Sequence, residues 1–153
     1  MEARRYRDAD WGEWLRMSIA LFPHETSENL AAGMRDFRAR NDAEVFVVAR
    51  SDESLSGFVE VGSRLYADGC DSSPVGYIEA WFVDEDIRRL GLGRALLDAA
   101  EGWARQRGYT EMASDALLDN IVSHRAHERA GYAEVERVVQ FRKPIANPSS
   151  VAT

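Results

Sequence analysis

The chain has 153 residues, of which 45% are hydrophobic and 29% are charged, and its formal net charge is -7. These values suit one globular domain with one core, and no apolar run approaches the roughly 20 residues that span a bilayer. The excess of acid argues against nucleic acid as the main partner. It is compatible with a polycationic small-molecule substrate, or with solubility alone.

The first residues lack the apolar stretch of a secretory signal. Cys70 is the only cysteine, so no disulfide can form within the chain, which suits a reducing compartment. We therefore expect a cytoplasmic protein with no membrane contact.

A short strand and two helices are expected first. Residues 2–7 favour the strand. Between 11 and 22, apolar residues recur at the spacing of an amphipathic helix, and Asp8 or Asp10 can cap it. A second helix is expected from Ser27 to about Arg40.

A hairpin and a long loop come next. The nearly continuous apolar run within 44–50 is typical of a strand covered on both faces, and 57–65 reads as its hairpin partner. The loop at 66–74 is longer than a tight hairpin needs, which indicates a functional role.

The strand expected at 75–83 contains a carboxylate. Alternation predicts two faces, with Tyr77, Glu79 and Trp81 on one and Ile78, Ala80 and Phe82 on the other. A carboxylate in an apolar strand is costly unless it is paired or reaches a polar cavity. Glu79 is therefore either part of a structural ion pair with an arginine or a functional group.

A basic, glycine-rich turn follows this strand and precedes a strongly periodic helix. The first N–H groups of a helix have no partners and carry partial positive charge, so they suit a pyrophosphate. Gly91 and Gly93 allow close approach, and Arg88, Arg89 and Arg94 add charge. The turn matches neither the P-loop pattern nor G-x-G-x-x-G, which argues against a nucleotide triphosphatase or dinucleotide site.

The remaining elements are expected in the order helix, strand, helix, strand. The first helix ends at Gly108 and buries one stripe of side chains: Leu92, Leu96, Ala99, Trp103 and Ala104. The strand at 109–115 brings Asp115 close to the Glu79 strand if the two run parallel. Asp119 or Asn120 caps the next helix, which ends near Ala130, and the last strand covers 132–143. We expect one domain over 1–143 and a flexible tail over 144–153.

The segment 88–93, Arg-Arg-Leu-Gly-Leu-Gly, resembles the acetyl-coenzyme A signature Q/R-x-x-G-x-G/A of the GNAT acyltransferase superfamily, and the element order matches. The segments 68–75, 111–115 and 134–143, with the Glu79 strand, closely resemble the aminoglycoside 6'-N-acetyltransferases of the chromosomal enterobacterial and Acinetobacter type. The resemblance is strong from about Tyr66 to Lys143 and weaker before it. It implies an α+β GNAT fold, with a mixed central sheet whose fourth and fifth strands splay apart between flanking helices.

The resemblance also implies the donor, acetyl-coenzyme A, and where it binds. Its pantetheine would meet the backbone of Trp81, Phe82 and Val83, with an N–H near Val83 as oxyanion donor, and its pyrophosphate would lie on Arg89, Leu90, Gly91, Leu92, Gly93 and Arg94. Asn120 matches a further position that contacts the cofactor.

The implied reaction is direct attack of an amine on the thioester, which needs a base, an oxyanion donor and a proton for the thiolate. Glu79 and Asp115 would orient or deprotonate the amine. His127 stands where many members have a catalytic tyrosine, so it is either the thiolate acid or a packing residue. His124 and His127 lack any metal motif, so no metal is expected, and direct transfer needs no nucleophile at Cys70.

The implied acceptor is an aminoglycoside, and its acetylation would confer resistance to the drug. The candidate binding residues are Phe22, Tyr66, Asp68, Asp71, Ser72, Glu79 and Asp115. Phe22 stands where relatives often have tryptophan. A homodimer is expected, built through the last strand or the loop at 66–74. Two alternatives stay open: acetylation of another amine, such as a polyamine or a protein N-terminus, and a non-catalytic acetyl-coenzyme A binding module.

Overall fold

A computed structural model describes residues 2–148. The strands are β1 (Ala3–Arg5), β2 (Ala43–Ala49), β3 (Leu55–Arg64), β4 (Val75–Val83) and β5 (Met112–Ser114). The helices are α1 (Trp11–Leu21), α2 (Ser27–Ala39), α3 (Leu92–Gln106) and α4 (Ile121–Arg129). No helix in this described part is both long and apolar enough to cross a membrane.

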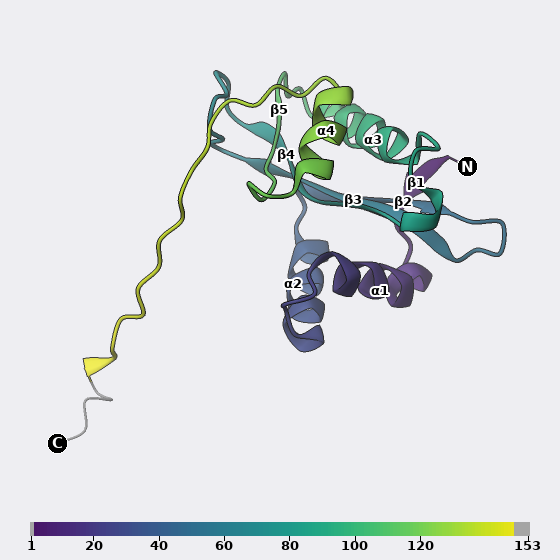
Figure 1. Ribbon diagram of the computed structural model, residues 1–153, viewed down its shortest axis with the longest axis horizontal. Coiled ribbons are helices and arrows are strands. Elements are labelled where there is room, and N and C mark those ends of the chain that lie inside the picture. Colours follow the sequence, from purple (N-terminus) through teal and green to yellow (C-terminus); the bar gives the residue numbers. More distant parts are fainter. Residues whose placement is uncertain (1, 149–153) are drawn as a thin grey trace.

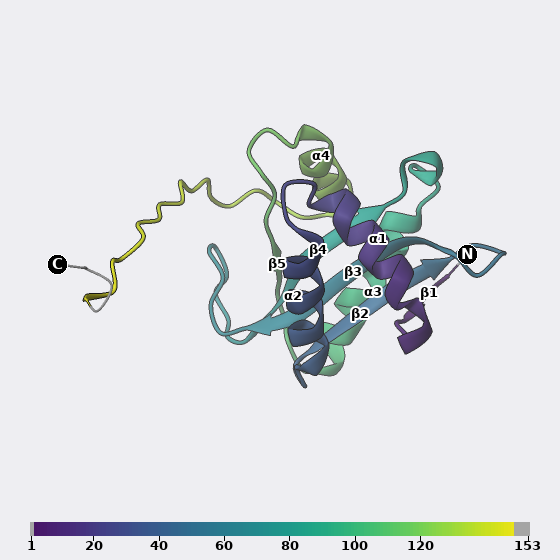
Figure 2. The same ribbon diagram turned by 90° about the horizontal axis from the view of Figure 1, so that it is seen from below.

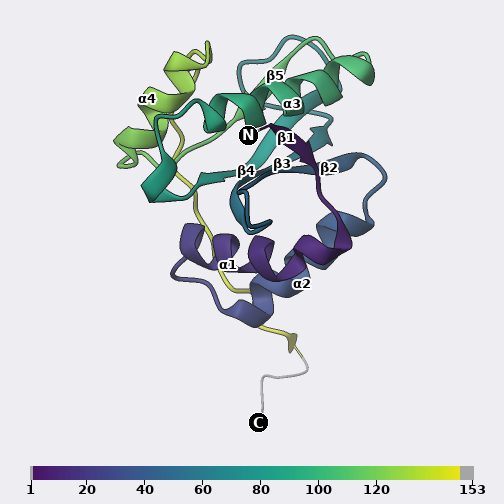
Figure 3. The same cartoon turned by 90° about the vertical axis from the view of Figure 1, so that its right-hand side faces the viewer.

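The sheet lies between two layers of helices. Figures 1 and 3 show α1 and α2 on one face and α3 and α4 on the other, and Figure 2 shows α1 and α2 crossing the strands. One part of the core joins the sheet to α3 through residues such as Val59, Leu96 and Trp103. The other joins it to α1 and α2 through Trp14 and Phe58. The buried stripe of α3 follows the predicted helical spacing, except that Ala99 is only partly buried and Leu97 and Ala100 are buried as well.

The five strands lie in the order β1-β2-β3-β4-β5. The first four are antiparallel neighbours, whereas β5 runs parallel to β4 and pairs only from Gly76–Met112 to Ile78–Ser114. Beyond Ile78, β4 has no pairing with β5, so its backbone edge from Glu79 to Val83 is open on that side. This confirms the predicted GNAT fold with its splayed fourth and fifth strands.

A β-bulge at Glu79 corrects the predicted faces of β4. Glu60 pairs with Ala80, and Val61 pairs with Ile78, so Glu79 is the extra residue. The bulge places Ile78 on the α3 side together with Trp81, whereas Ala80 packs on the α1 and α2 side. Strict alternation had predicted Ile78 opposite to Trp81, and it failed because an inserted residue shifts the period-two pattern by one.

Three helix ends follow the predicted signals. Gly91 precedes α3 with φ 80°, and Gly108 follows it with φ 82°, both in the left-handed region that glycine tolerates. The Asn120 side chain accepts a hydrogen bond from the Ser123 N–H and caps α4. Asp10 precedes α1 but makes no side-chain cap, because its carboxylate accepts hydrogen bonds from Arg4 instead.

The predicted last strand is wrong for residues 132–143. After Tyr132 the chain pairs with no strand of the described part. Val135 lies against Gly69, and the segment beyond it runs away from the domain (Figure 1). Val139 and Phe141 are 77% and 91% exposed. A strand forms only where a second backbone satisfies its hydrogen bonds, and residues 2–148 present none there. Within the predicted tail, residues 149–153 lie outside the described part.

Candidate active site

The glycine-rich turn between β4 and α3 presents an open cradle. Arg89 and Gly91 both have positive φ, 72° and 80°. A Cβ built on Gly91 would meet nothing within 4 Å, so space is free above the first N–H groups of α3. The Trp81 indole N–H donates to the Gly93 carbonyl at 3.1 Å and fixes the turn against β4. Leu90 is 65% exposed beside it. The cradle fits a phosphate group.

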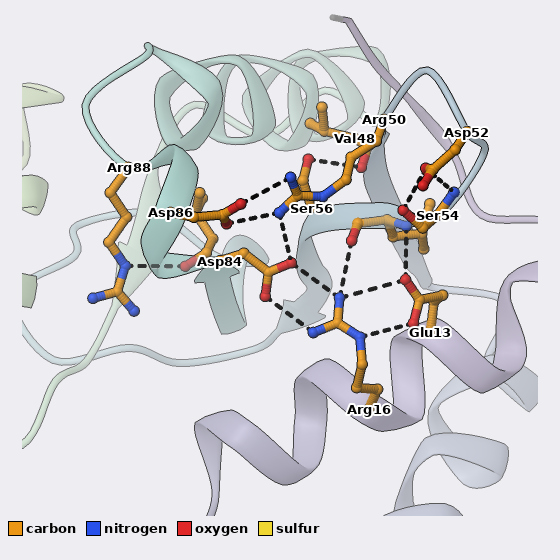
Figure 4. Close-up of polar contacts among 12 residues, drawn as sticks. Glu13, Arg16, Val48, Arg50, Asp52, Ser54, Ser56, Asp84, Asp86 and Arg88 are labelled. Carbon is orange, nitrogen blue, oxygen red and sulfur yellow. Dashed lines mark hydrogen bonds and ion pairs between the residues drawn. The ribbon is translucent and has the colours of Figure 1, made fainter.

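An ion-pair network holds the chain that leads into this turn (Figure 4). Asp84 follows β4 and accepts hydrogen bonds from Arg16 of α1, at 3.1 and 3.0 Å, and from Arg50, at 3.3 Å. Arg50 also binds both oxygens of Asp86. Hydrogen bonds to Asp84, and secondly to Glu13, raise the pKa of Arg16. The network therefore anchors the end of β4 to α1 and to the β2–β3 hairpin.

The open edge of β4 lies beside the cradle. Trp81 and Val83 pack toward α3, while the Phe82 ring lies 6.2 Å from that of Phe58 on the other side. Arg88 donates through Nε to the Val83 carbonyl at 3.0 Å. Because the backbone here lacks a strand partner on the β5 side, its amides can hydrogen-bond an extended ligand such as a pantetheine arm.

An open pocket of about 410 Å³ lies on the opposite side of β4, under α1 and α2. Side chains from both helices, from β3 and from β4 line it: Ser18, Phe22, Glu25, Asn29, Leu30, Gly33, Met34, Phe37, Arg40, Glu60 and Glu79. Three carboxylates face one guanidinium, so the pocket suits a cationic ligand. Of the predicted substrate residues, Phe22 and Glu79 lie here.

A chain of contacts connects the two predicted carboxylates. Arg64 donates to both oxygens of Glu79, at 2.8 and 2.7 Å. The same guanidinium lies 3.5 Å from the centre of the Tyr77 ring, and the Tyr77 hydroxyl donates to Asp115 at 2.5 Å. Burial, followed by the bond to Asp115, raises the pKa of Tyr77. Glu79 thus forms the ion pair with an arginine that the structural alternative predicted, and it also lines the pocket, as the functional alternative requires.

His127 links α4 to β5. Its Nδ1 lies 2.7 Å from the Ser123 carbonyl, which can only accept, so Nδ1 carries a proton. Its Nε2 lies 2.8 Å from the Ser114 hydroxyl. The ring also meets Trp81 edge to face at 5.1 Å between centroids. Both ring nitrogens are therefore occupied by protein partners.

The loop at 66–74 lies outside the pocket lining. The Tyr66 hydroxyl donates to Asp68 at 3.0 Å, and Tyr66 is 73% exposed. The backbone N–H groups of Asp71 and Ser72 donate to Glu111 at 2.8 and 2.7 Å. Glu111, which precedes β5, thus fixes the fold of this loop. The structure does not bring these four predicted residues together with Phe22 and Glu79.

Cys70 is half-buried against the small cluster around Val75 and Tyr77. Burial raises the pKa of its thiol, so it is a poor nucleophile. Among residues 2–148, no three histidine, cysteine or acidic side chains gather in a group that could hold a metal ion.

Glu60 is a pocket residue that the sequence reasoning missed. It lies on β3 and accepts a hydrogen bond from the Trp14 indole N–H at 3.2 Å. Burial, and secondly the charge of Glu79, raise the pKa of Glu60 to about 7. Its signal was available, because Glu60 is a carboxylate within the apolar run 58–61, a feature similar to the one that singled out Glu79.

Comparison with known proteins agrees with this geometry. A family model described as the acetyltransferase (GNAT) family matches residues 5–132. An aminoglycoside N(6')-acetyltransferase type 1 from Klebsiella aerogenes is 39% identical over 145 residues, which are 93% of this chain and 95% of the relative. One from Stenotrophomonas maltophilia is 37% identical, over 93% and 92%.

Solved structures show the same relationship. The apo aminoglycoside antibiotic 6'-N-acetyltransferase AAC(6')-IG from Acinetobacter haemolyticus superposes with a TM-score of 0.88 at 34% identity, over 95% of this chain and 100% of that one. AAC(6')-Iy, solved with the bisubstrate analogue CoA-S-monomethyl-acetylneamine, superposes with a TM-score of 0.86 at 29% identity, over 94% and 98%. The resemblance seen in the sequence is confirmed, and this chain belongs to the GNAT family of acetyltransferases.

Proposed function

We propose that this protein transfers the acetyl group of acetyl-coenzyme A to the 6'-amino group of an aminoglycoside, a modification that confers resistance to the drug. The observation that carries the proposal is the acid-lined pocket of about 410 Å³ on one side of β4, next to the open β4 edge and the glycine-rich cradle. The relatives align with nearly the whole chain, and their names support the choice of acceptor.

The donor fits the residues that are present. The free N–H groups at the start of α3, together with Arg89 and Arg94, would hold its pyrophosphate. The open backbone of Trp81 to Val83 would hold its pantetheine, and the Asn120 amide nitrogen remains available because only its oxygen caps α4. The thioester supplies an activated acetyl carbonyl.

The acceptor side fits a polycation. Several ammonium groups on an aminoglycoside would meet Glu25, Glu60 and Glu79, and Phe22, which is 42% exposed, offers an aromatic wall for a sugar ring. The attacking amine must be neutral, so it must lose a proton. Glu79 and Asp115 are proposed to orient it, since the contact chain through Arg64 and Tyr77 holds both carboxylates in place.

His127 is proposed as a positioning residue. Its two ring nitrogens bind Ser114 and Ser123, so the ring holds β5 and α4 together where the strands diverge. As a thiolate acid it would have to give up one of these contacts, and a thiolate leaving group needs little assistance.

A homodimer is proposed through the exposed segment 133–148 and the loop at 66–74. Val135, Val139 and Phe141 project at a spacing typical of one strand face, and all three are more than half exposed. Pairing with a second copy would satisfy this backbone and bring Tyr66, Asp68, Asp71 and Ser72 toward an acceptor.

The dimer is tested by light scattering of Phe141→Asp, which should become monomeric, with Leu117→Asp on a different exposed surface as the control. Equal masses for wild type and Phe141→Asp would contradict it. The site of action is proposed to be the cytoplasm, which fits the lone cysteine, and cell fractionation would test it.

The function is tested by thiol release from acetyl-coenzyme A with kanamycin, spermidine and a peptide amine as acceptors. We expect turnover with kanamycin only, or a much higher kcat/KM for kanamycin than for spermidine and the peptide amine. Turnover confined to spermidine or the peptide would identify a different acceptor. Tight binding of acetyl-coenzyme A without turnover of any acceptor would indicate a non-catalytic module.

A further inference from the structure

Within residues 2–148, Glu60 forms no ion pair, although it lines the acid-rich pocket beside Glu79. The donor that its carboxylate meets is the Trp14 indole, at 3.2 Å, and Trp14 is fully buried. Glu79 is neutralised by Arg64, and Asp115 accepts a hydrogen bond from Tyr77. Glu60 is half-buried, and removing an unpaired carboxylate from water is costly, so its retention calls for a ligand.

The charged groups around Glu60 favour it as the group of the pocket that accepts a proton. Glu79 from β4 adds negative charge, Glu25 comes from the α1–α2 connection, and Arg40 after α2 is the cation of the lining. Arg40 is held by Asp42 and by the Ser63 carbonyl. Burial and Glu79 raise the pKa of Glu60 to about 7, which is close to the optimum for a general base at neutral pH.

The polar surroundings of Glu60 also indicate a ligand. Ser18 of α1 lines the same pocket and is 2% exposed. Its hydroxyl oxygen is the one buried polar side-chain atom of the described residues without a hydrogen-bond partner. Buried hydroxyl groups are normally satisfied. A polar ligand bound in this pocket would have both Ser18 and Glu60 on its walls.

The bulge places Glu60 beside the open edge. Glu60 pairs across the sheet with Ala80, and the extra residue Glu79 brings its own carboxylate onto the same pocket wall. The open edge of β4 starts at this point. An amine held by Glu79 would therefore lie within reach of Glu60, directly or through one water molecule.

We propose that Glu60 is the general base that takes a proton from the ammonium group of the acceptor. This inference rests on the proposed acetyl transfer. The Glu60 carboxylate gains one proton, the neutral amine forms the C–N bond to the acetyl carbon, and the C–S bond breaks. Of the two protons that the nitrogen loses, one ends on the thiolate and one is released to solvent.

The test is the pH dependence of acetylation of kanamycin by Glu60→Gln, which keeps an oxygen for the Trp14 bond. For the wild type, kcat/KM should rise as pH increases through about 7. In Glu60→Gln this acidic limb should be lost and kcat should fall about 10²-fold. Glu60→Asp should regain part of kcat and keep the limb. Glu44→Gln, which removes a carboxylate of β2 outside the pocket, is the charge-matched control and should keep the wild-type profile.

The outcomes separate this inference from the function on which it rests. A wild-type enzyme that acetylates none of the amines would reject the function. An active wild type whose acidic limb persists in Glu60→Gln would reject Glu60 as base. A rise in KM with kcat and its pH profile unchanged would likewise overturn the proposal, because Glu60 would then only bind a cation. If Glu60→Gln fails to fold, Glu60→Asp decides: a shorter base must slow kcat, and full activity would exclude the role.

Discussion

Arg64 holds Glu79 by two parallel hydrogen bonds, at 2.8 and 2.7 Å, on the wall of the candidate acceptor pocket. Such a bidentate pair fixes the carboxylate in one orientation. The Arg64 side chain is 42% exposed, so the pair adds little to the stability of the fold. Its consequence is electrostatic, because the Arg64 guanidinium places a positive charge directly against the Glu79 carboxylate.

Glu79→Gln should lower kcat/KM for an aminoglycoside by one to two orders of magnitude. The substitution leaves Arg64 without its counter-charge beside a cationic acceptor, and it removes an oxygen that orients the amine. Steady-state kinetics at saturating acetyl-coenzyme A measure the effect. The double variant Arg64→Gln/Glu79→Gln should regain about tenfold, because the repelling guanidinium is gone. Additive losses in the double variant would contradict the electrostatic explanation.

Asp115→Asn should reduce kcat by about tenfold or more while acetyl-coenzyme A binding stays unchanged. The reason is that Asp115 presents a carboxylate at the end of β5, held by the Tyr77 hydroxyl. Tyr77→Phe removes that bond and keeps the charge, so it should have a smaller effect. Equal losses in the two variants would mean that the hydrogen bond matters and the carboxylate charge does not.

Gly91→Val should weaken binding of coenzyme A by at least about tenfold, measured by calorimetry. The φ of 80° at Gly91 suits glycine, and a branched side chain there would strain the turn and occupy the free space above the N–H groups. Gly102→Ala, in the interior of α3 with no atom near the added Cβ, should raise stability by roughly 0.5–1 kcal/mol and leave binding intact. Unchanged affinity in Gly91→Val would remove the turn from the donor site.

His127→Ala should lower the free energy of unfolding by about 1–3 kcal/mol and reduce kcat only a few-fold, because the ring joins Ser114 to Ser123. Chemical denaturation measures the free energy of unfolding, and steady-state kinetics measure kcat. Ser114→Ala breaks the same contact from the β5 side and should produce a similar but smaller loss. A fall in kcat of about 10²-fold at unchanged stability would assign the thiolate acid to His127 instead.

Glu60→Gln should stabilise the fold at pH 8. The pKa of Glu60 in the folded state, about 7, lies above its ordinary value of 4.5, so the folded protein binds more protons than the unfolded chain between these two pH values. Stability is therefore lost as pH rises through this window. Removing the ionisable group should raise the free energy of unfolding at pH 8, on the order of 2 kcal/mol, and the gain should fade below about pH 4.5. A gain that does not change with pH would contradict a raised pKa.

The elements that form the proposed donor site are predictable from the sequence because they depend on local features. The apolar spacing of α3, the glycine before it and Gly108 after it are properties of neighbouring residues, and the structure confirms each of them. The short parallel pairing of β5 with β4 follows from the right-handed crossover between them.

The acceptor side depends on contacts between distant residues. Glu79 could be identified as unusual, but the bulge that turns it toward α1 and α2 is a matter of register between β3 and β4. Its partner Arg64 lies 15 positions earlier. Glu60 was not predicted although it carries a similar signal, and the last strand was expected where the described residues supply no strand partner.

The sequence by itself therefore determined the family, the order of the elements up to α4 and the turn suited to a pyrophosphate, because helical periodicity, glycine conformations and short motifs act within one segment. The tertiary structure alone decided which carboxylates share a pocket and which have a counter-charge. It showed that Glu79 pairs with Arg64 and that Glu60 forms no ion pair within the described part of the chain, since only the packing of β3, β4, α1 and α2 sets the surroundings of each charge.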